Sequence, residues 1–282
     1  MTTMTTTETA TKRTTTDLRA HFGFHQTPFT REISVADRWL CPHLDEVVDD
    51  LARTVDHRQS AVLLAPAGTG KTALLRALVA RLPEPRYRVH YVKVTSISKR
   101  DLCREIAAAC GLAPTGTYPG LVRRLQERFE SCHTSDGLRP VLILDEAHDL
   151  RPDVLGMLRI LTNFEMDSRL VLSLVLAGQP PLLTLLRRDE FEAVAQRIAH
   201  VASLRLLSRG ESRQYMEHRI RIAGSRQFLF DDQATEAVFE LTRGNLRAID
   251  HLCRKALEVA ALSGHGAVDP AIVTAARAKL LL

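Results

Sequence analysis

The sequence predicts an α/β protein, in which helices sandwich a parallel sheet and a small all-helical domain follows. Three observations support this prediction. Apolar runs with the length of buried strands alternate with helical stretches as far as about residue 207. One of these runs leads through a glycine-rich loop directly into a helix. After residue 207 the strand signals stop, and helical stretches separated by glycine or proline fill the rest of the chain.

The stretch AVLLAPAGTGKT, residues 61–72, carries the clearest chemical signal. Its apolar run predicts a strand, its glycines a tight turn, and Lys71 opens the next helix. Glycine at positions 68 and 70 lets backbone N–H groups face phosphate oxygens where a side chain would collide. The helix N-terminus adds positive potential at the same place. We therefore expect a nucleotide to contact Ala65, Pro66, Ala67, Gly68, Thr69, Gly70, Lys71, Thr72 and Ala73.

Within this loop, Lys71 would reach the β- and γ-phosphates, and the Thr72 hydroxyl would coordinate Mg²⁺. One position departs from the usual pattern G-x-x-x-x-G-K-[ST], because Ala65 stands where the first glycine belongs. If that position requires a positive φ, alanine costs on the order of 1 kcal/mol there. We expect the loop to be slightly strained for this reason.

The stretch VLILD, residues 141–145, is an apolar run that ends in an acid and suits a buried central parallel strand. A carboxylate at the carboxyl end of such a strand can hold Mg²⁺, so Asp145 joins Thr72 in the expected magnesium site. Glu146 would then polarise the attacking water as general base. Residues 145–148 also spell the helicase box DEAH, but the chain has no room for the second RecA-like domain that such helicases need.

Periodicity and turn residues place the other elements. In the α/β part we expect helices over residues 44–55, 71–82, 99–111, 118–132 and 152–165, and strands over 61–65, 89–95, 141–145, 170–177 and 199–206. In the helical part we expect helices over 211–223, 232–243 and 245–263, and a fourth from 270. The predicted domains are a disordered threonine-rich tail (1–16), an α/β ATPase domain (17–207) and a helical lid domain (208–282).

Composition excludes several classes of protein. The five cysteines are spread along the chain without any CxxC, which argues against a disulfide framework or a zinc site and for a reducing compartment. Cys103 and Cys110 flank apolar helical positions, so we expect these two to be buried. No apolar run approaches the roughly 18 residues of a membrane span, and no signal-peptide core is visible, so we expect a cytoplasmic protein. A net charge of +5 favours an acidic partner only weakly.

Four further features leave alternatives open. Gln179, after the strand LVLAG, would contact the γ-phosphate or the water, or else cap a helix. Arg197, before the last strand, would act on a neighbouring subunit's nucleotide or lie on the surface. Arg247 opens a lid helix and would sense nucleotide from the second domain. The aromatic lead-in around Phe24 and Phe29 would pack near adenine or cap the core.

Together these motifs resemble the ExeA-type branch of the AAA+ ATPases, akin to transposon helper ATPases of the TnsC, TniB and IstB kind. The resemblance spans residues 18–278 and includes APAGTGKT, LILDEAH, LVLAGQPPL, QRI and TRGNLRAID in one order. It implies Walker A at Lys71 and Thr72, Walker B at Asp145 and Glu146, sensor 1 at Gln179, an arginine finger at Arg197 and sensor 2 at Arg247. Asn245 departs from the isoleucine or proline that the family often has near sensor 2.

The resemblance implies an ATP hydrolase that uses Mg²⁺ and assembles with ATP, as a ring or a filament, on double-stranded DNA. Such a protein recruits or regulates a transposase, and it binds DNA largely independently of sequence. Lys99 and Arg100 are the candidate phosphate contacts, unless they are solvated charges at a helix start. Two other functions are considered: a secretion or envelope-assembly ATPase, whose known members add a membrane span and a wall-binding domain not found in this sequence, and a nucleotide-switched protein scaffold.

Overall fold

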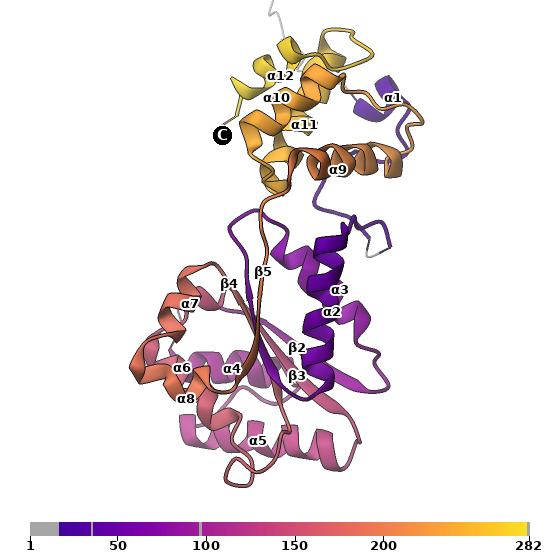
Figure 1. Ribbon diagram of the computed structural model, residues 1–282. Helices are drawn as coiled ribbons and strands as arrows, with labels where there is room; N and C mark the ends of the chain where they lie inside the picture. Colours follow the sequence, from indigo (N-terminus) through magenta and orange to yellow (C-terminus); the bar gives the residue numbers. More distant parts are fainter. Residues whose placement is uncertain (1–16, 35, 96–97, 281–282) are drawn as a thin grey trace, which may run out of the picture. The chain divides into compact units, whose positions relative to one another are not determined.

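The computed structural model describes residues 17–34, 36–95 and 98–280, which form two compact units (Figure 1). The first unit, here the α/β domain, comprises Glu32–Glu211 and Arg243–Arg247. The second, the helical domain, comprises the described parts of Met1–Arg31, Ser212–Thr242 and Ala248–Leu282. The predicted threonine-rich tail lies outside the described residues.

A five-stranded parallel sheet in the order β2-β3-β4-β1-β5 forms the centre of the α/β domain. Its strands are β1 (Ser60–Leu64), β2 (Tyr87–Lys93), β3 (Arg139–Asp145), β4 (Ser173–Gly178) and β5 (Ile198–Ser203). The inner strands β1 and β4 are buried along their whole length, whereas the edge strands β2 and β5 alternate between buried and exposed residues. Continuous apolar runs are typical of strands covered on both faces, and the predicted fold class is confirmed.

Helices cover both faces of this sheet. One layer consists of α2 (Pro42–Asp56) and α3 (Lys71–Arg81). The other consists of α4 (Lys99–Ala109), α5 (Tyr118–Thr134), α6 (Pro152–Leu161), α7 (Pro181–Leu186) and α8 (Glu192–Ala195), with short 3₁₀ turns at Ala147–Asp149 and Asp189–Phe191. Because successive strand residues face opposite sides, Ala61 and Leu63 pack against the α2/α3 layer, and Val62 and Leu64 pack against the α4–α8 layer.

The largest difference from the predicted elements concerns the end of α6, which stops at Leu161 rather than at residue 165. The Thr162 hydroxyl donates a hydrogen bond to Leu158 O (2.9 Å), a local bond that competes with further helix. Glu165, Met166 and Asp167 then all adopt positive φ values. The chain therefore leaves the helix in a left-handed turn that side-chain periodicity alone does not reveal.

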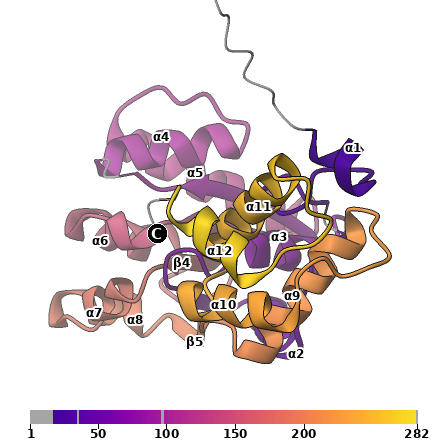
Figure 2. The ribbon, with the colours of Figure 1, turned by 90° about the horizontal axis from the view of Figure 1, so that it is seen from above.

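The helical domain contains α1 (Leu18–Phe22), α9 (Arg209–Ile222), α10 (Asp232–Thr242), α11 (Leu246–Leu262) and α12 (Pro270–Arg277) (Figure 2). The start of α12 follows the predicted pattern of a cap and then proline, since Asp269 Oδ1 accepts a hydrogen bond from Ile272 N (2.8 Å). A buried apolar face on α11, including Ile249, Leu252 and Leu257, packs into the centre of this domain.

The aromatic lead-in belongs to the helical domain and not to the α/β domain in which it was predicted. The Phe29 ring lies edge-on to Phe230 with ring centroids 6.2 Å apart, and His25 N donates to Ala223 O (2.7 Å). Conversely, residues 243–247 were predicted in the lid but cluster with the α/β domain. The expected boundaries at 17 and 207 are therefore replaced by an interleaved division of the chain.

All five cysteines are buried, including Cys103 and Cys110, for which burial was predicted. Burial raises the pKa of the Cys103 thiol to about 11, so this thiol stays protonated at neutral pH. Among the described residues, none of the helices combines the length and the apolar character needed to cross a bilayer.

Candidate nucleotide site

The loop between β1 and α3 has the backbone geometry of a phosphate cradle. Gly68 and Gly70 have φ values of +80° and +92°, a conformation that residues with a Cβ rarely adopt. A Cβ built on Gly68 would lie 2.3 Å from Asn245 Oδ1, so a side chain there would displace the Asn245 amide in addition to straining φ. Lys71 is the first residue of α3, and the first backbone N–H groups of a helix have no partner within it. The loop can therefore present several N–H donors to an anion.

Ala65 is not strained, which corrects the expectation drawn from its departure from the glycine pattern. It is absent from the described residues with positive φ, and its side chain is completely buried. Its N–H donates to Gly178 O (2.9 Å) and so extends the pairing of β1 with β4. A methyl group at this position packs in the core. The turn itself begins later, where the Thr69 hydroxyl donates to Pro66 O (2.8 Å).

Lys71 and two carboxylates form a nearly buried ionic cluster at the carboxyl edge of the sheet. The Lys71 ammonium contacts Asp145 Oδ1 and lies 3.0 Å from Glu146 Oε2. The Lys71 and Asp145 side chains are 9% and 2% exposed, so little solvent screens their interaction. Asp145 also accepts hydrogen bonds from Glu146 N (2.8 Å) and from the Tyr91 hydroxyl (2.9 Å). Burial and the nearby Asp145 carboxylate raise the pKa of Tyr91, which keeps its hydroxyl a donor.

The backbone at Glu146 is unusual, because this non-glycine residue has a φ of +58° directly after β3. Such conformations cost free energy and gather at functional sites. Behind Glu146, His148 Nδ1 lies 3.6 Å from Glu146 Oε2 and has no hydrogen-bond partner although it is buried. His148 Nε2 lies 2.7 Å from Gln179 Nε2. A neutral His148 with its proton on Nδ1 accepts from the Gln179 amide and points that proton at Glu146.

The segment 243–247 closes over the glycine loop from within the same domain. Asn245 Nδ2 donates to Ala67 O (2.7 Å), and Arg247 N donates to Gly68 O (3.1 Å). Leu207 N in turn donates to Gly244 O (3.1 Å). The backbone of Arg247 is thus anchored on the loop while its side chain is exposed. Asn245, which departs from the family pattern, bonds directly to the candidate nucleotide loop.

The donor set fits a magnesium nucleotide. Thr72 offers an exposed hydroxyl at the start of α3, and Asp145 ends the neighbouring strand β3. Mg²⁺ typically takes one or two protein oxygens and completes its shell with phosphate and water. The described residues contain no group of three or more His, Cys, Asp or Glu side chains that could enclose a metal. Which residues bind nucleotide and metal stays a prediction.

Arg197 lies at the opposite edge of the sheet from Lys71. It directly precedes β5, whose Ile198 pairs with Ser60 at the start of β1, whereas the glycine loop follows the end of β1. Five strand residues at about 3.3 Å each separate the two edges by roughly 16 Å. The Arg197 guanidinium is ion-paired with Asp167 and donates to Ala193 O (2.9 Å). Arg197 therefore cannot reach the glycine loop of its own chain.

The two candidate DNA contacts lie at the start of α4, just after residues 96–97, which are outside the described ranges. Both side chains are exposed. The Lys99 ammonium lies 5.1 Å from the centre of the Tyr118 ring, and Arg100 Nη2 donates to Gly116 O (3.1 Å). Each cation thus has a partner within the chain, and its contact with DNA stays a prediction.

Three residues in this arrangement were not singled out from the sequence. Tyr91 donates a hydrogen bond to Asp145, His148 lies between Gln179 and Glu146, and Asp167 forms an ion pair with Arg197. Only Tyr91 left a signal, because the alternating strand VHYVKVT predicts which residues share a face. The other two contacts join segments about 30 residues apart along the chain. No local pattern reports such pairs.

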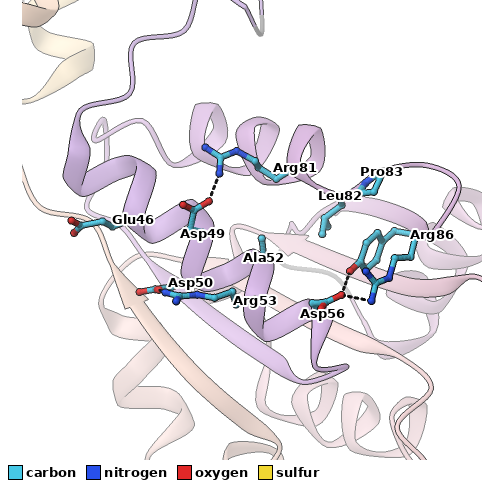
Figure 3. A pocket seen from close by; sticks show the side chains of 11 residues that line it. Glu46, Asp49, Asp50, Ala52, Arg53, Asp56, Arg81, Leu82, Pro83 and Arg86 are labelled. Atoms are coloured by element: carbon cyan, nitrogen blue, oxygen red, sulfur yellow. Dashed lines mark hydrogen bonds and ion pairs between the residues drawn. The ribbon is translucent and has the colours of Figure 1, made fainter.

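A groove of about 690 Å³ on the α2/α3 layer, here the charged groove, lies away from this site (Figure 3). It is formed by the end of α2, the end of α3 and the start of β2. Asp56 accepts from the Tyr87 hydroxyl (2.6 Å) and pairs with Arg86 (2.7 Å), and Arg81 pairs with Asp49. Its charges thus pair with one another, and no glycine-rich loop faces it. We do not assign it to the nucleotide.

Comparisons with known proteins agree with this geometry. Residues 53–186 match a protein family described as "AAA domain". Over 248 residues the chain is 32% identical to General secretion pathway protein A of Aeromonas hydrophila, and the match covers 86% of this chain and 45% of that protein. The chain thus spans about half the length of this curated relative.

Among solved structures, the chain is similar to the Aeropyrum pernix ORC1 protein in complex with DNA, with a TM-score of 0.67 and 22% identity over 86% of this chain and 66% of that one. It is also similar to the Aeropyrum pernix ORC2 protein in ADPNP-ADP complexes, with a TM-score of 0.68 and 16% identity over 89% and 70%. At such identities these similarities show that the fold is shared with these two proteins.

Proposed function

We propose that the chain is an ATP hydrolase that assembles with ATP on double-stranded DNA and acts as a helper of transposition. The proposal starts from the match of residues 53–186 to the AAA domain family. One observation carries the enzymatic part of this proposal. Lys71, the adjacent pair Asp145 and Glu146, and Gln179 come from three distant parts of the sequence and lie at the carboxyl edge of one sheet beside a glycine loop. Ligands of open α/β sheets bind at that edge.

The chemistry follows from what each side chain can do. Lys71 and the N–H groups of the loop would bind phosphate oxygens, and Glu146 would orient and deprotonate the attacking water. Mg²⁺, held by Thr72 and Asp145, would neutralise phosphate charge. Gln179 would contact the γ-phosphate or the water, and its bond to His148 links it to the environment of Glu146. Arg247, anchored through its N–H on Gly68, would report the nucleotide to the helical domain.

Assembly is proposed because Arg197 cannot reach the glycine loop of its own chain. A neighbouring copy could present its glycine loop to Arg197, in which case binding of ATP and association of subunits become coupled. Such a head-to-tail contact closes into a ring or continues as a filament.

DNA and a transposase are the least direct parts of the proposal. In their favour are the resemblance of the linked motifs to transposon helper ATPases and the basic residues Lys99 and Arg100 at the surface. A similar fold is also found in an ORC1 protein in complex with DNA. The proposed DNA contact is electrostatic and therefore largely independent of sequence.

A second candidate function is a secretion-associated or envelope-assembly ATPase. The 32% identity to General secretion pathway protein A favours it specifically. The same nucleotide chemistry serves both candidates, so the partner distinguishes them. A cytoplasmic location likewise stays a prediction.

The decisive experiment measures size and affinity on a random-sequence DNA duplex with ATP, ADP, a non-hydrolysable ATP analogue or no nucleotide. We expect large assemblies on DNA with ATP or the analogue alone. Glu146→Gln should bind ATP, hydrolyse it at least roughly 100-fold more slowly and keep the assembly intact. Normal turnover by Glu146→Gln would remove Glu146 as the base. If duplex DNA changes nothing in any nucleotide state, the DNA proposal fails and the secretion alternative gains.

A further inference from the structure

The loop between α6 and β4 holds an apolar side chain out into solvent. Glu165, Met166 and Asp167 have φ values of 47°, 55° and 66°, which residues other than glycine rarely adopt. The loop is nevertheless braced, because Asp167 N donates to Asn163 Oδ1 (3.1 Å) and the Ser168 hydroxyl donates to Glu165 O (2.7 Å). Met166 at its tip is 96% exposed. A strained, braced loop that exposes methionine, an adaptable apolar side chain, has the character of a binding element.

The position of Arg197 identifies the face to which this loop belongs. Asp167, next to Met166, is the ion-pair partner of Arg197. Since Arg197 cannot reach its own glycine loop, its proposed target is the nucleotide of another copy. Any copy whose nucleotide meets Arg197 is therefore brought to the Met166 loop as well.

The receiving surface is an apolar groove of about 860 Å³ between α3 and the edge strand β2. It starts at Thr72, beside Lys71, and Leu75, Val79, Val89 and Tyr91 line it further along. Val79 and Tyr91 are 39% and 45% exposed, so apolar surface is accessible there. α3 belongs to the α2/α3 layer, whereas Arg197 and the Met166 loop lie beside the α4–α8 layer on the other face of the sheet.

Charge also favours this groove over the charged groove of the same layer. Met166 stands between two acids, Glu165 and Asp167, while Arg76 and Arg88, together with Glu84, line the apolar groove. The charged groove in Figure 3 is lined by four acids and three arginines, most of them paired with one another, so it offers the acidic loop no net positive charge.

We propose that Met166 of one subunit seats in the apolar α3/β2 groove of the next, next to the nucleotide that Arg197 of the same subunit reaches. The contact is heterologous, because the loop and the groove lie on different layers of one chain. This inference rests on the proposed function, since it takes ATP-dependent assembly of identical subunits as given.

Cysteine cross-linking tests the pairing directly. One preparation carries Met166→Cys and another Val79→Cys, and the five native cysteines are all buried. When the two are mixed with the ATP analogue and duplex DNA under mild oxidation, we expect a cross-linked dimer. Its yield should exceed at least tenfold that obtained when Arg53→Cys, in the charged groove, replaces Val79→Cys. Equal yields from the two grooves would overturn the assignment.

A second test does not depend on oxidation. Met166→Asp should raise the protein concentration needed for assembly at least tenfold, whereas Met166→Leu should change it less than threefold. Nucleotide binding by separate subunits should stay the same in both. Leu262→Asp, which alters another exposed apolar residue (61% exposed) in the helical domain, is the control.

The outcomes separate the two proposals. If wild-type protein assembles with ATP but Met166→Asp assembles equally well, the Met166 contact is refuted and the proposed function stands. If wild-type protein forms no assembly in any nucleotide state, with or without DNA, the proposed function fails and this contact fails with it.

Discussion

Each domain of this chain contains a nearly buried cation beside an aspartate that accepts a hydrogen bond from a tyrosine. In the α/β domain, Lys71 contacts Asp145, which accepts a hydrogen bond from the Tyr91 hydroxyl (2.9 Å). In the helical domain, Arg219 lies 3.7 Å from Asp250, which accepts from the Tyr215 hydroxyl (2.7 Å). Lys71 is 9% exposed and Arg219 is 5% exposed. Burial and charge alone would mark both clusters as candidate sites.

Their surroundings separate them. The Arg219 guanidinium donates to Thr30 O (2.6 Å) and to the Tyr215 hydroxyl (3.1 Å), and it lies 5.7 Å from the centre of the Phe29 ring. Its donors are thus directed at its own chain, and the cluster fastens the lead-in segment to the helical domain.

Lys71, by contrast, stands at a helix start beside glycines with positive φ, the strained Glu146 and the exposed Thr72. The comparison teaches that the backbone around a buried ion pair, more than the pair itself, distinguishes a binding site from a structural clamp.

The largest effect is expected from Arg219→Ala, which leaves Asp250 buried without its cation. Breaking a buried pair typically costs about 3–5 kcal/mol in the free energy of unfolding. Urea unfolding followed by circular dichroism should show this loss, together with detachment of the lead-in, which limited proteolysis near Phe29 would detect. Arg219→Lys should recover only part of it, because lysine lacks the planar set of donors. A loss below about 1 kcal/mol would contradict the clamp.

Lys71→Ala should have the opposite effects from Arg219→Ala: a large loss of nucleotide affinity and a smaller loss of stability. We expect nucleotide affinity to fall at least roughly 100-fold, since a charge-assisted contact with phosphate is lost. The free energy of unfolding should fall less than in Arg219→Ala, because Asp145 retains the Glu146 N–H and the Tyr91 hydroxyl as donors. Titration with a fluorescent ATP analogue, beside urea unfolding, measures both. Unchanged affinity would refute the phosphate cradle.

The two tyrosines provide a milder version of the same comparison. Tyr91→Phe removes one donor from Asp145 and should slow ATP turnover roughly 3- to 10-fold with little loss of stability, since Tyr91 is 45% exposed. Tyr215→Phe removes a buried donor and should lower the free energy of unfolding by about 1–2 kcal/mol without slowing turnover per folded molecule. Steady-state kinetics and urea unfolding of both variants test this. A slower turnover in Tyr215→Phe or a loss of stability in Tyr91→Phe would contradict the comparison.

The smallest expected effect concerns pH. The bidentate pair with Arg205, together with the Ser208 N–H, lowers the pKa of Glu211 to about 2. A lowered pKa means that this stabilisation is present above the unfolded value near 4.5 and is lost as pH falls toward 2. Glu211→Gln should therefore destabilise the protein by about 1 kcal/mol at pH 7, and the difference should vanish near pH 2.

Asp250 shifts in the other direction, because burial raises its pKa. The stability that the protein gains by keeping Asp250 protonated is fully present below the pKa of the unfolded state. It is lost as pH rises through the pKa of the folded state. Asp250→Asn should accordingly become more stable relative to wild type as pH rises through the folded pKa of Asp250. Glu211→Gln should become less stable relative to wild type between pH 2 and about 4.5. Urea unfolding at several pH values tests the two signs, and parallel pH profiles for the two variants would contradict this assignment.

The sequence by itself determined the parts of this protein that depend on local pattern. The apolar runs of β1, β3 and β4, the glycine loop before Lys71 and the proline-started helices follow from periodicity and turn chemistry, so the fold class and the candidate nucleotide residues were predictable. Local pattern failed where a distant partner decides the conformation. Ala65 suggested strain from its type alone, yet pairing with Gly178 places it in ordinary backbone.

Only the tertiary structure decided which distant residues meet. It placed the lead-in on the helical domain through Arg219, set Asn245 on the glycine loop, joined His148 to Gln179 and paired Asp167 with Arg197. The physical reason is that such contacts depend on how the strands pair and the helices pack, and a side chain's type does not record its partner. The candidate residues of the proposed nucleotide chemistry were therefore predictable from the sequence, whereas the residues that hold and position them required the three-dimensional structure.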